Sequence, residues 1–168
     1  MKVLVAGAGI GGLTTALMLH ARGIPVQIYE TAAEVREAGV GINILPHAIR
    51  ELETLGLLPA LDVVGLRTRR LTYYTRSGQE VWSELRGTYA GHEVPQFSIH
   101  RGRLQHLLYK AVLDRLGPKA VQTGRRLGGF VQDDKGITAH FANSIDGSKG
   151  ITVRGDVLIC CDGIHSAG

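Results

Sequence analysis

The sequence predicts an α/β fold with a parallel central sheet, on three observations. A short apolar strand, residues 2–6, runs directly into Gly-x-Gly-x-x-Gly at residues 7–12 and then into residues of helix-forming composition, 13–21. A second strand, residues 25–29, follows that helix and ends at an acidic side chain. A hairpin pattern follows at residues 71–83. Strand, helix and strand in this order are typical of a Rossmann-like unit, to which the hairpin adds a β-rich section.

The glycine-rich turn predicts a binding site for a pyrophosphate. Gly7 permits the sharp turn from strand to helix, Gly9 lets the backbone approach the ligand, and Gly12 lets helix and strand pack closely. The free amides at the helix start and the positive end of the helix dipole favour an anion there. The candidate cofactor-binding residues of the turn are Gly7, Gly9, Ile10, Gly11 and Gly12.

The acidic residue after the second strand is the second part of this pattern. Glu30 lies close to the expected spacing of about 20 residues beyond Gly12 for a carboxylate that accepts a hydrogen bond from a ribose hydroxyl. Such an acid favours an unphosphorylated ribose, as in FAD or NAD, over the 2′-phosphate of NADP. A solvated Glu at a strand end is the alternative interpretation.

Bulk composition narrows the function classes. The 168 residues suit one domain, or one domain and part of another, and the formal net charge of +4 is mild. Basic residues are scattered without interleaved stacking aromatics, so we expect no nucleic-acid partner. No apolar run approaches the roughly 20 residues of a membrane span, and the first strand begins at Lys2, where a signal peptide would lie. We therefore expect no membrane association and a cytoplasmic location.

The two cysteines are adjacent and lack the spacing of a metal site or a disulfide framework. Cys160 and Cys161 would point to opposite faces of a strand, and we expect buried free thiols. No His, Ser or Asp spacing suggests a catalytic triad, so we name no catalytic residue and no metal ligand.

Further elements follow from apolar periodicity and from Gly and Pro punctuation. Helices are expected at residues 32–38, 46–55 and 101–116. Strands are expected at residues 71–75, 80–83, 97–99, 121–123, 128–132, 137–141 and 156–161, the last a continuous apolar run suited to a buried parallel strand.

Four ordered motifs together resemble the N-terminal part of the group A FAD-dependent aromatic monooxygenases, the para-hydroxybenzoate hydroxylase-like family. The motifs are Gly7 to Leu13; Glu30 with Arg36 and Gly39 to Asn43; Ser98 to Arg101; and Gly155 to Ser166. The last resembles the family's DG motif, although this chain has Cys160 and Cys161 where the family normally has Gly-Ala. The section from Glu80 to Gly102 is especially similar to the phenazine hydroxylase branch.

The resemblance implies an FAD/NAD(P)-binding domain and further cofactor residues. Arg36 and Asn43 would lie near the flavin and its phosphates, and Arg101 would hold the diphosphate. The backbone of Leu127 would contact the adenine side, and Asp162 would serve both FAD and NAD(P)H. The alternatives are a solvated charge for Arg36, a surface Arg at a helix start for Arg101, a plain strand residue for Leu127, and a turn-initiating residue for Asp162.

The resemblance also implies a reaction, in which NAD(P)H reduces FAD and O₂ supplies an oxygen atom to a small aromatic substrate, with a phenazine as one candidate. The expected ranges are 1–70 for the βαβ part of the FAD domain, 71–100 for a substrate-domain segment, and 101–168 for the return to the FAD domain.

The chain ends just after the DG motif, whereas the family continues through a Gly-Asp motif that completes the FAD site. We therefore expect an N-terminal fragment that is inactive alone, and the sequence leaves its oligomeric state open. An NAD-dependent dehydrogenase and a non-catalytic nucleotide-binding fragment are the alternatives.

Overall fold

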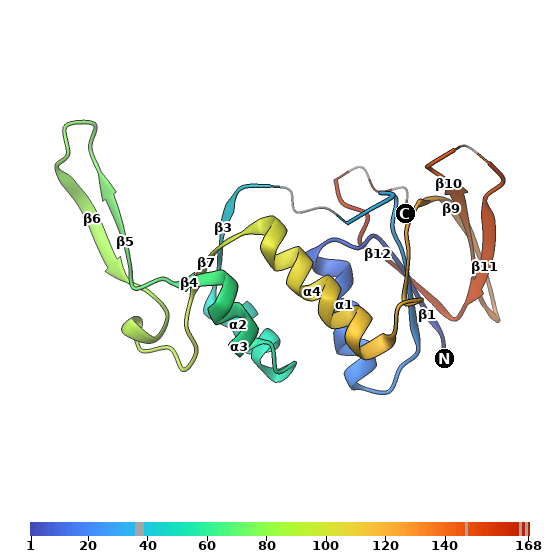
Figure 1. Cartoon of the computed structure of the whole chain (residues 1–168), viewed down its shortest axis with the longest axis horizontal. Helices are drawn as coiled ribbons and strands as arrows, with labels where there is room; N and C mark the ends of the chain where they lie inside the picture. The colour runs from blue at the N-terminus through green and yellow to red at the C-terminus, as the bar shows by residue number, and fades with distance from the viewer. Residues whose placement is uncertain (36–38, 147, 165, 167) are drawn as a thin grey trace. The chain divides into compact units, whose positions relative to one another are not determined.

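The structure is a computed structural model that describes residues 1–35, 39–146, 148–164, 166 and 168. The chain forms two compact units, one made of Met1–Glu37 with Gln105–Gly168 and the other of Ala38–Leu104. The helices and strands of both are labelled in Figure 1. The first unit holds the glycine-rich turn, so its layers are described first.

A four-stranded parallel sheet is the base of the first unit, as the sequence predicts. Its order is β12-β1-β2-β8, and every neighbouring pair is parallel. The strands are β1 (Val3–Ala6), β2 (Val26–Tyr29), β8 (Val121–Gln122) and β12 (Val157–Cys160). All four residues of β1 are buried because this strand has a neighbour on each side. The apolar run of residues 3–6 thus matches the central position of the strand.

Helix α1 (Ile10–Ala21) follows β1 after three residues and packs its small and aliphatic side chains inward. Its buried residues are Gly12, Leu13, Ala16 and Leu17. The helix ends before Gly23, whose positive φ of 71° suits the turn back into β2. The predicted strand–turn–helix–strand order of residues 2–29 is confirmed.

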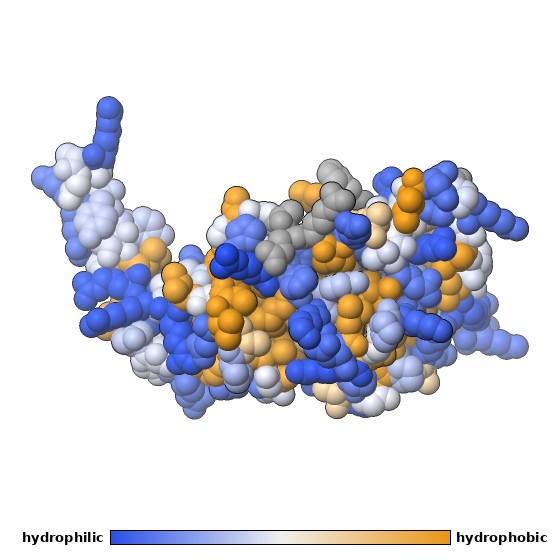
Figure 2. All heavy atoms as spheres, in the orientation of Figure 1, coloured by the Kyte–Doolittle hydropathy of each residue, from blue (hydrophilic) through white to orange (hydrophobic). Residues whose placement is uncertain are grey.

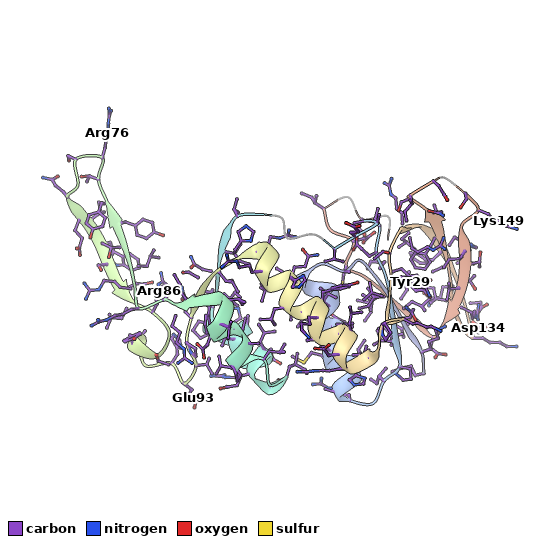
Figure 3. The ribbon with its side chains drawn as sticks, viewed as in Figure 1. Tyr29, Arg76, Arg86, Glu93, Asp134 and Lys149 are labelled. Atoms are coloured by element: carbon purple, nitrogen blue, oxygen red, sulfur yellow. The ribbon has the colours of Figure 1, made fainter. Side chains whose placement is uncertain are left out.

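A three-stranded antiparallel sheet, β11-β10-β9, forms the second layer of this unit. Its strands are β9 (Arg125–Asp133), β10 (Gly136–Asn143) and β11 (Ile151–Gly155). One core cluster joins the two sheets: Leu4, Ala6 and Tyr29 from the parallel sheet, and Leu127, Ile137, Ala139 and Phe141 from the antiparallel sheet. The rings of Tyr29 and Phe141 stack with centroids 4.1 Å apart, and Tyr29 is labelled in Figure 3. This stack connects the end of β2, next to Glu30, to the second sheet.

The second unit contains a small antiparallel sheet, three helical segments and a hairpin. The sheet has the order β3-β7-β4, and β5 and β6 form a two-stranded sheet. The elements are β3 (Gly41–Ile44), α2 (Pro46–Thr54), α3 (Leu58–Val64), β4 (Gly65–Arg67), β5 (Arg70–Tyr74), β6 (Glu80–Leu85), the 3₁₀ helix η1 (Gly87–Ala90) and β7 (Phe97–His100). Hydrophilic atoms cover the tip of the hairpin in Figure 2, where Figure 3 labels Arg76.

Most predicted elements are confirmed, including helix α4 (Arg101–Leu116) and both strands of the hairpin. The helix expected at 32–38 is wrong, because residues 31–34 form bends and residue 35 has no regular structure; residues 36–38 lie outside the described part. The predicted burial of the last strand is also wrong. Among the described strands, β12 lies at the edge of the sheet beside β1, and Val157 is 41% exposed.

Within the described ranges, no helix is long and apolar enough to cross a membrane.

The core between the two sheets predicts a large loss of stability on truncation of Phe141, which is 1% exposed. We expect Phe141→Ala to lower the free energy of unfolding by about 3–5 kcal/mol, because it removes the stack on Tyr29 and leaves a cavity. Urea denaturation measures the change. Phe130→Ala, at a 43% exposed position on β9, is the matched control and should cost far less. Equal losses for the two variants would show that Phe141 does not join the sheets.

Candidate dinucleotide-binding site

In the turn between β1 and α1, the backbone packs so closely that only glycine fits at two positions. Gly7 has a φ of 100°, and a Cβ there would overlap the carbonyl oxygen of Cys161 and lie 2.7 Å from its carbonyl carbon. A Cβ on Gly12 would overlap the carbonyl oxygen of Gly7 and lie 3.3 Å from the Cβ of Cys161. Gly7 and Gly12 are therefore required by the protein's own packing, as the sequence pattern predicts.

The other two glycines of the turn face open space. No heavy atom lies within 4 Å of a Cβ placed on Gly9 or on Gly11. Gly9 is the N-cap of α1, with extended backbone angles and no side-chain cap. Its carbonyl oxygen accepts from the amide of Leu13 at 3.0 Å, so the amides of Ile10, Gly11 and Gly12 precede the helical hydrogen-bond ladder. The turn thus offers backbone donors and the positive helix end next to the open space at Gly9 and Gly11.

Glu30 is held against this turn by two backbone amides. One carboxylate oxygen, Oε2, accepts from the amide of Ala8 at 2.6 Å, and Oε1 accepts from the amide of Ala32 at 2.7 Å. Each carboxylate oxygen retains a second lone pair for another donor. The two amides fix the orientation of the carboxylate, and the remaining lone pairs suit a pair of vicinal hydroxyl groups.

Asp162 follows β12 and lies beside the glycine turn. The amide of Cys161 donates to Ala6 at 2.7 Å, and the Cα of Asp162 lies 3.0 Å from the position of a Gly7 Cβ. The hydroxyl of Ser166 donates to Oδ1 of Asp162 at 2.5 Å. The turn that holds Gly7 and Gly12 and the distant Asp162 are therefore brought together at the carboxyl ends of two neighbouring parallel strands.

The adjacent cysteines depart from the expectation of buried thiols. Cys160 is exposed and Cys161 is partly buried. Desolvation, together with the nearby Asp162 carboxylate, raises the pKa of both thiols, although a hydrogen bond with Thr15 opposes the shift at Cys161. Both thiols therefore stay protonated at neutral pH and are weak nucleophiles.

Asn43 and Arg101 belong to the second unit and are described within it. Ser98 Oγ donates to Oδ1 of Asn43 at 2.7 Å, and its contact with Thr68 Oγ1 is also 2.7 Å. Because Ser98 has one proton, Thr68 donates to Ser98, and the Asn43 side chain accepts through Oδ1. The Arg101 stem lies against Gly39, whose φ is 125°; a Cβ there would be 3.1 Å from the Arg101 Cβ.

Leu127 and Arg36 are the remaining two residues that the sequence predicts to contact the cofactor. The side chain of Leu127 is 3% exposed and lies in the core between the sheets, so a ligand can reach only its backbone. Arg36 lies outside the described residues.

Sequence reasoning missed Gln105, on the second turn of α4. Its side-chain amide donates to the carbonyl oxygen of Ala8 at 2.8 Å, which ties α4 to the glycine-rich turn. No local pattern identifies this residue, because a Gln in an amphipathic helix is ordinary. The contact arises only when residues 8 and 105 are brought together by the fold.

Comparison with known proteins identifies the family. The FAD binding domain model matches residues 1–168, so the chain belongs to this family. Phenazine 1,6-dicarboxylic acid hydroxylase PhzS of Lysobacter antibioticus is 46% identical over 166 residues, which are 98% of this chain and 41% of the relative. An FAD-dependent urate hydroxylase of Klebsiella pneumoniae is 32% identical over 99% of this chain and 41% of its own length. The chain thus spans about two-fifths of these relatives.

Solved structures agree with this assignment. Klebsiella pneumoniae HpxO, complexed with FAD and uric acid, superposes with a TM-score of 0.79 at 31% identity over 99% of this chain and 40% of that one. The p-nitrophenol 4-monooxygenase PnpA of Pseudomonas putida has a TM-score of 0.87 at 18% identity over 98% of this chain and 41% of that one, which supports the fold alone. The resemblance to FAD-dependent aromatic hydroxylases predicted from the motifs is confirmed.

The geometry of the turn predicts that alanine substitutions at two adjacent glycines of α1 change the free energy of unfolding differently. Gly12→Ala should lower the free energy of unfolding by about 1–3 kcal/mol, because its methyl group overlaps the Gly7 carbonyl. Gly11→Ala should leave stability unchanged or raise it by up to about 1 kcal/mol, because Gly11 is exposed and helical. Urea denaturation of both variants checks this. A Gly12→Ala variant as stable as Gly11→Ala would contradict the packing described for the turn.

Proposed function

We propose that this chain binds FAD at the turn between β1 and α1, and that the whole protein is an FAD-dependent monooxygenase that hydroxylates an aromatic substrate. The observation that carries the proposal is the division of the turn into two sides. Gly7 and Gly12 are packed against the protein, while Gly9 and Gly11 leave an open surface lined by amides. Membership of the FAD binding domain family supports FAD as the dinucleotide.

The residues of the turn fit the adenosine diphosphate half of this cofactor. A pyrophosphate needs several N–H donors at close backbone approach, and the amides of Ile10, Gly11 and Gly12 can supply them beside the open space at Gly9 and Gly11. The Glu30 carboxylate supplies acceptors for the ribose hydroxyls. A 2′-phosphate would place negative charge against that carboxylate, so the site favours FAD over NADP.

Five further residues are proposed cofactor contacts. Arg101 and Arg36 are proposed at the phosphates, where a guanidinium can donate two parallel hydrogen bonds. Asn43, whose Oδ1 accepts from Ser98, is proposed near the flavin. The Leu127 backbone is proposed at the adenine side, and Asp162 is proposed to serve both FAD and NAD(P)H. These assignments are supported by the resemblance to the family.

FAD, when bound, supplies the redox chemistry, with NAD(P)H proposed as the electron donor and O₂ as the source of the transferred oxygen atom. The residues of this chain bind and orient the cofactor: the turn fixes the diphosphate, and Glu30 fixes the ribose. The relatives named for phenazine 1,6-dicarboxylic acid and for urate support a planar aromatic substrate, and the 46% identity to the phenazine hydroxylase favours a phenazine.

Binding of FAD by the purified chain tests the first part of the proposal. We expect a flavin absorption spectrum that survives desalting, or saturable uptake of added FAD in a calorimetric titration. Gly9→Val should weaken FAD binding by about tenfold or more, because a branched side chain fills the approach path of the pyrophosphate. The melting temperature of the FAD-free variant should stay close to that of the parent.

Three outcomes would count against this proposal. A chain that takes up no FAD would indicate a non-catalytic remnant of the fold. Tight NAD binding without FAD binding would indicate an NAD-dependent dehydrogenase. An unchanged FAD affinity in Gly9→Val would contradict the placement of the diphosphate.

The proposed ribose contact predicts that Glu30→Ala lowers the affinity for FAD. Removal of the acceptor should weaken FAD binding by about 1–3 kcal/mol, or about five- to 150-fold in the dissociation constant. Glu93→Ala, at an exposed position of the second unit, is the control and should leave the affinity unchanged. Equal affinities of Glu30→Ala and the parent chain would rule out the ribose hydrogen bond.

A further inference from the structure

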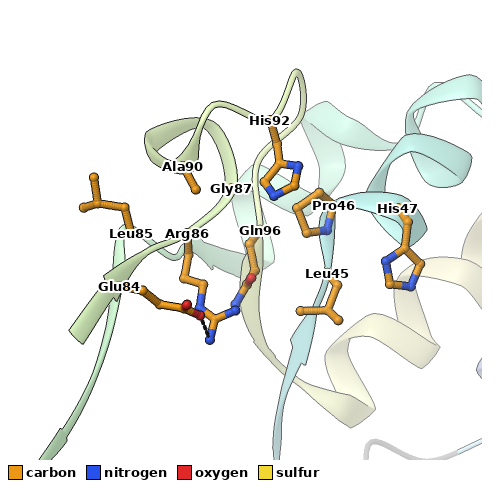
Figure 4. A pocket seen from close by; sticks show the side chains of 10 residues that line it. All are labelled: Leu45, Pro46, His47, Glu84, Leu85, Arg86, Gly87, Ala90, His92 and Gln96. Carbon is orange, nitrogen blue, oxygen red and sulfur yellow. Dashed lines mark ion pairs between the residues drawn. The ribbon is translucent and has the colours of Figure 1, made fainter. Parts of the chain in front are cut away.

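The second unit contains a cavity that shares no residue with the glycine-rich turn. Its volume is about 320 Å³, and it lies between the start of α2 and the segment that connects β6 to β7. Figure 4 shows its side chains: Arg86, Glu84 and Gln96 converge on one side, and His92, Pro46 and Leu45 lie on another. A volume of this order suits a small organic ligand.

Gln96 is the first sign that the cavity is built for a ligand. It is the buried polar residue of the described core, at 4% exposure, and it lines the cavity. Its backbone oxygen accepts from the amide of Thr68 at 2.8 Å, but its side-chain amide has no hydrogen-bond partner among the described residues. Its amide atoms are absent from the fully buried polar atoms of the described residues that lack a partner, so the amide is not enclosed and a ligand in the cavity can pair with it.

Arg86 is the second sign. Its guanidinium pairs with the carboxylate of Glu84 through Nη2, and its side chain is 26% exposed. The Nε atom is buried and has no hydrogen-bond partner within the described chain. The ion pair fixes the guanidinium beside the cavity, and the guanidinium has N–H donors beyond the one that Glu84 uses. Guanidinium donors suit the oxygens of a carboxylate.

The backbone holds these side chains in place. Gly87 has a positive φ of 54°, and a Cβ there would lie 3.1 Å from the Cα of Pro95 and would overlap the amide of Gln96. The amide of Arg86 donates to Arg69 at 2.9 Å. The segments that carry Arg86 and Gln96 are therefore locked together, and the donors of the cavity are arranged before any ligand arrives.

Several side chains around the cavity can donate hydrogen bonds. Arg86, Gln96 and the imidazoles of His47 and His92 can donate, whereas Glu84 is the one carboxylate among the described lining residues and is already paired. Apolar surface from Leu45, Pro46, Leu85 and Ala90 completes the lining. We propose that this cavity binds a small organic carboxylate, with its carboxylate on Arg86 and Gln96 and its apolar body against the aliphatic side chains.

Two other ligand classes fit less well. A metal ion needs several anionic or imidazole ligands together, and among the described residues no group of three His, Cys, Asp or Glu side chains could hold one. Inorganic phosphate would leave the apolar half of the lining unused. An amphipathic monocarboxylate uses both halves.

A calorimetric titration of the full chain with 1-naphthoate tests the proposal, with 1-naphthamide as the matched neutral ligand. We expect saturable binding of 1-naphthoate at one site and binding of the amide at least about tenfold weaker. Arg86→Gln should reduce the naphthoate affinity by about tenfold or more. Arg50→Gln, which removes an exposed Arg that pairs with Glu93 in the same unit, is the control and should leave the affinity unchanged.

Gln96→Leu separates a ligand contact from a structural role. Because its amide has no partner, we expect this variant to melt at the same or a higher temperature than the parent chain, and to bind naphthoate more weakly. A lower melting temperature would show that Gln96 is structural.

Three results would overturn the proposal: no binding of naphthoate, equal binding of acid and amide, or an Arg86→Gln variant with parental affinity. FAD binding is expected to persist in Arg86→Gln, so failure of this proposal and failure of the dinucleotide site give different results.

Discussion

The backbone of the β1–α1 turn approaches the residues after β12 so closely that two positions have no room for a side chain. A Cβ on Gly12 would overlap the Gly7 carbonyl oxygen, and a Cβ on Gly7 would overlap the carbonyl oxygen of Cys161. Since β1 is the buried strand between β2 and β12, this approach sets where α1 begins. It also leaves the amides at the start of α1 on the open side of the turn. The proposed diphosphate site is a consequence of how the sheet and helix pack.

The acidic end of the site depends on the same sheet. Glu30 follows β2, and its carboxylate accepts hydrogen bonds from the amides of Ala8 and Ala32. One residue earlier, Tyr29 stacks on Phe141 and joins the parallel sheet to the antiparallel sheet. The position of the carboxylate is therefore supported from both layers of the first unit. Stability of the core and geometry of the proposed ribose contact are linked through two consecutive residues.

Features with local signals could be predicted from the sequence, and features made by tertiary contacts could not. Gly7, Gly12 and Glu30 follow a spacing that reflects local backbone requirements, and helix α4 has a clear apolar periodicity. The exposure of β12 depends on which strands flank it, and the composition of residues 157–160 does not record this. The contact of Gln105 with Ala8 and the meeting of Leu45, Arg86 and Gln96 at the cavity arise from residues far apart in the chain. The cavity of the second unit could not be predicted from the sequence either, because its lining residues come from separate segments of the chain.

The central claim is that the open side of the glycine-rich turn holds the diphosphate of FAD. Titration of the ¹⁵N-labelled chain with FAD, followed by amide resonances in two-dimensional NMR spectra, tests it most directly. The account predicts large shifts for the amides of Ile10, Gly11 and Gly12, and small shifts for amides at the Asp133–Gly136 turn of the antiparallel sheet. Saturation with FAD without a change at Ile10, Gly11 and Gly12 would contradict it.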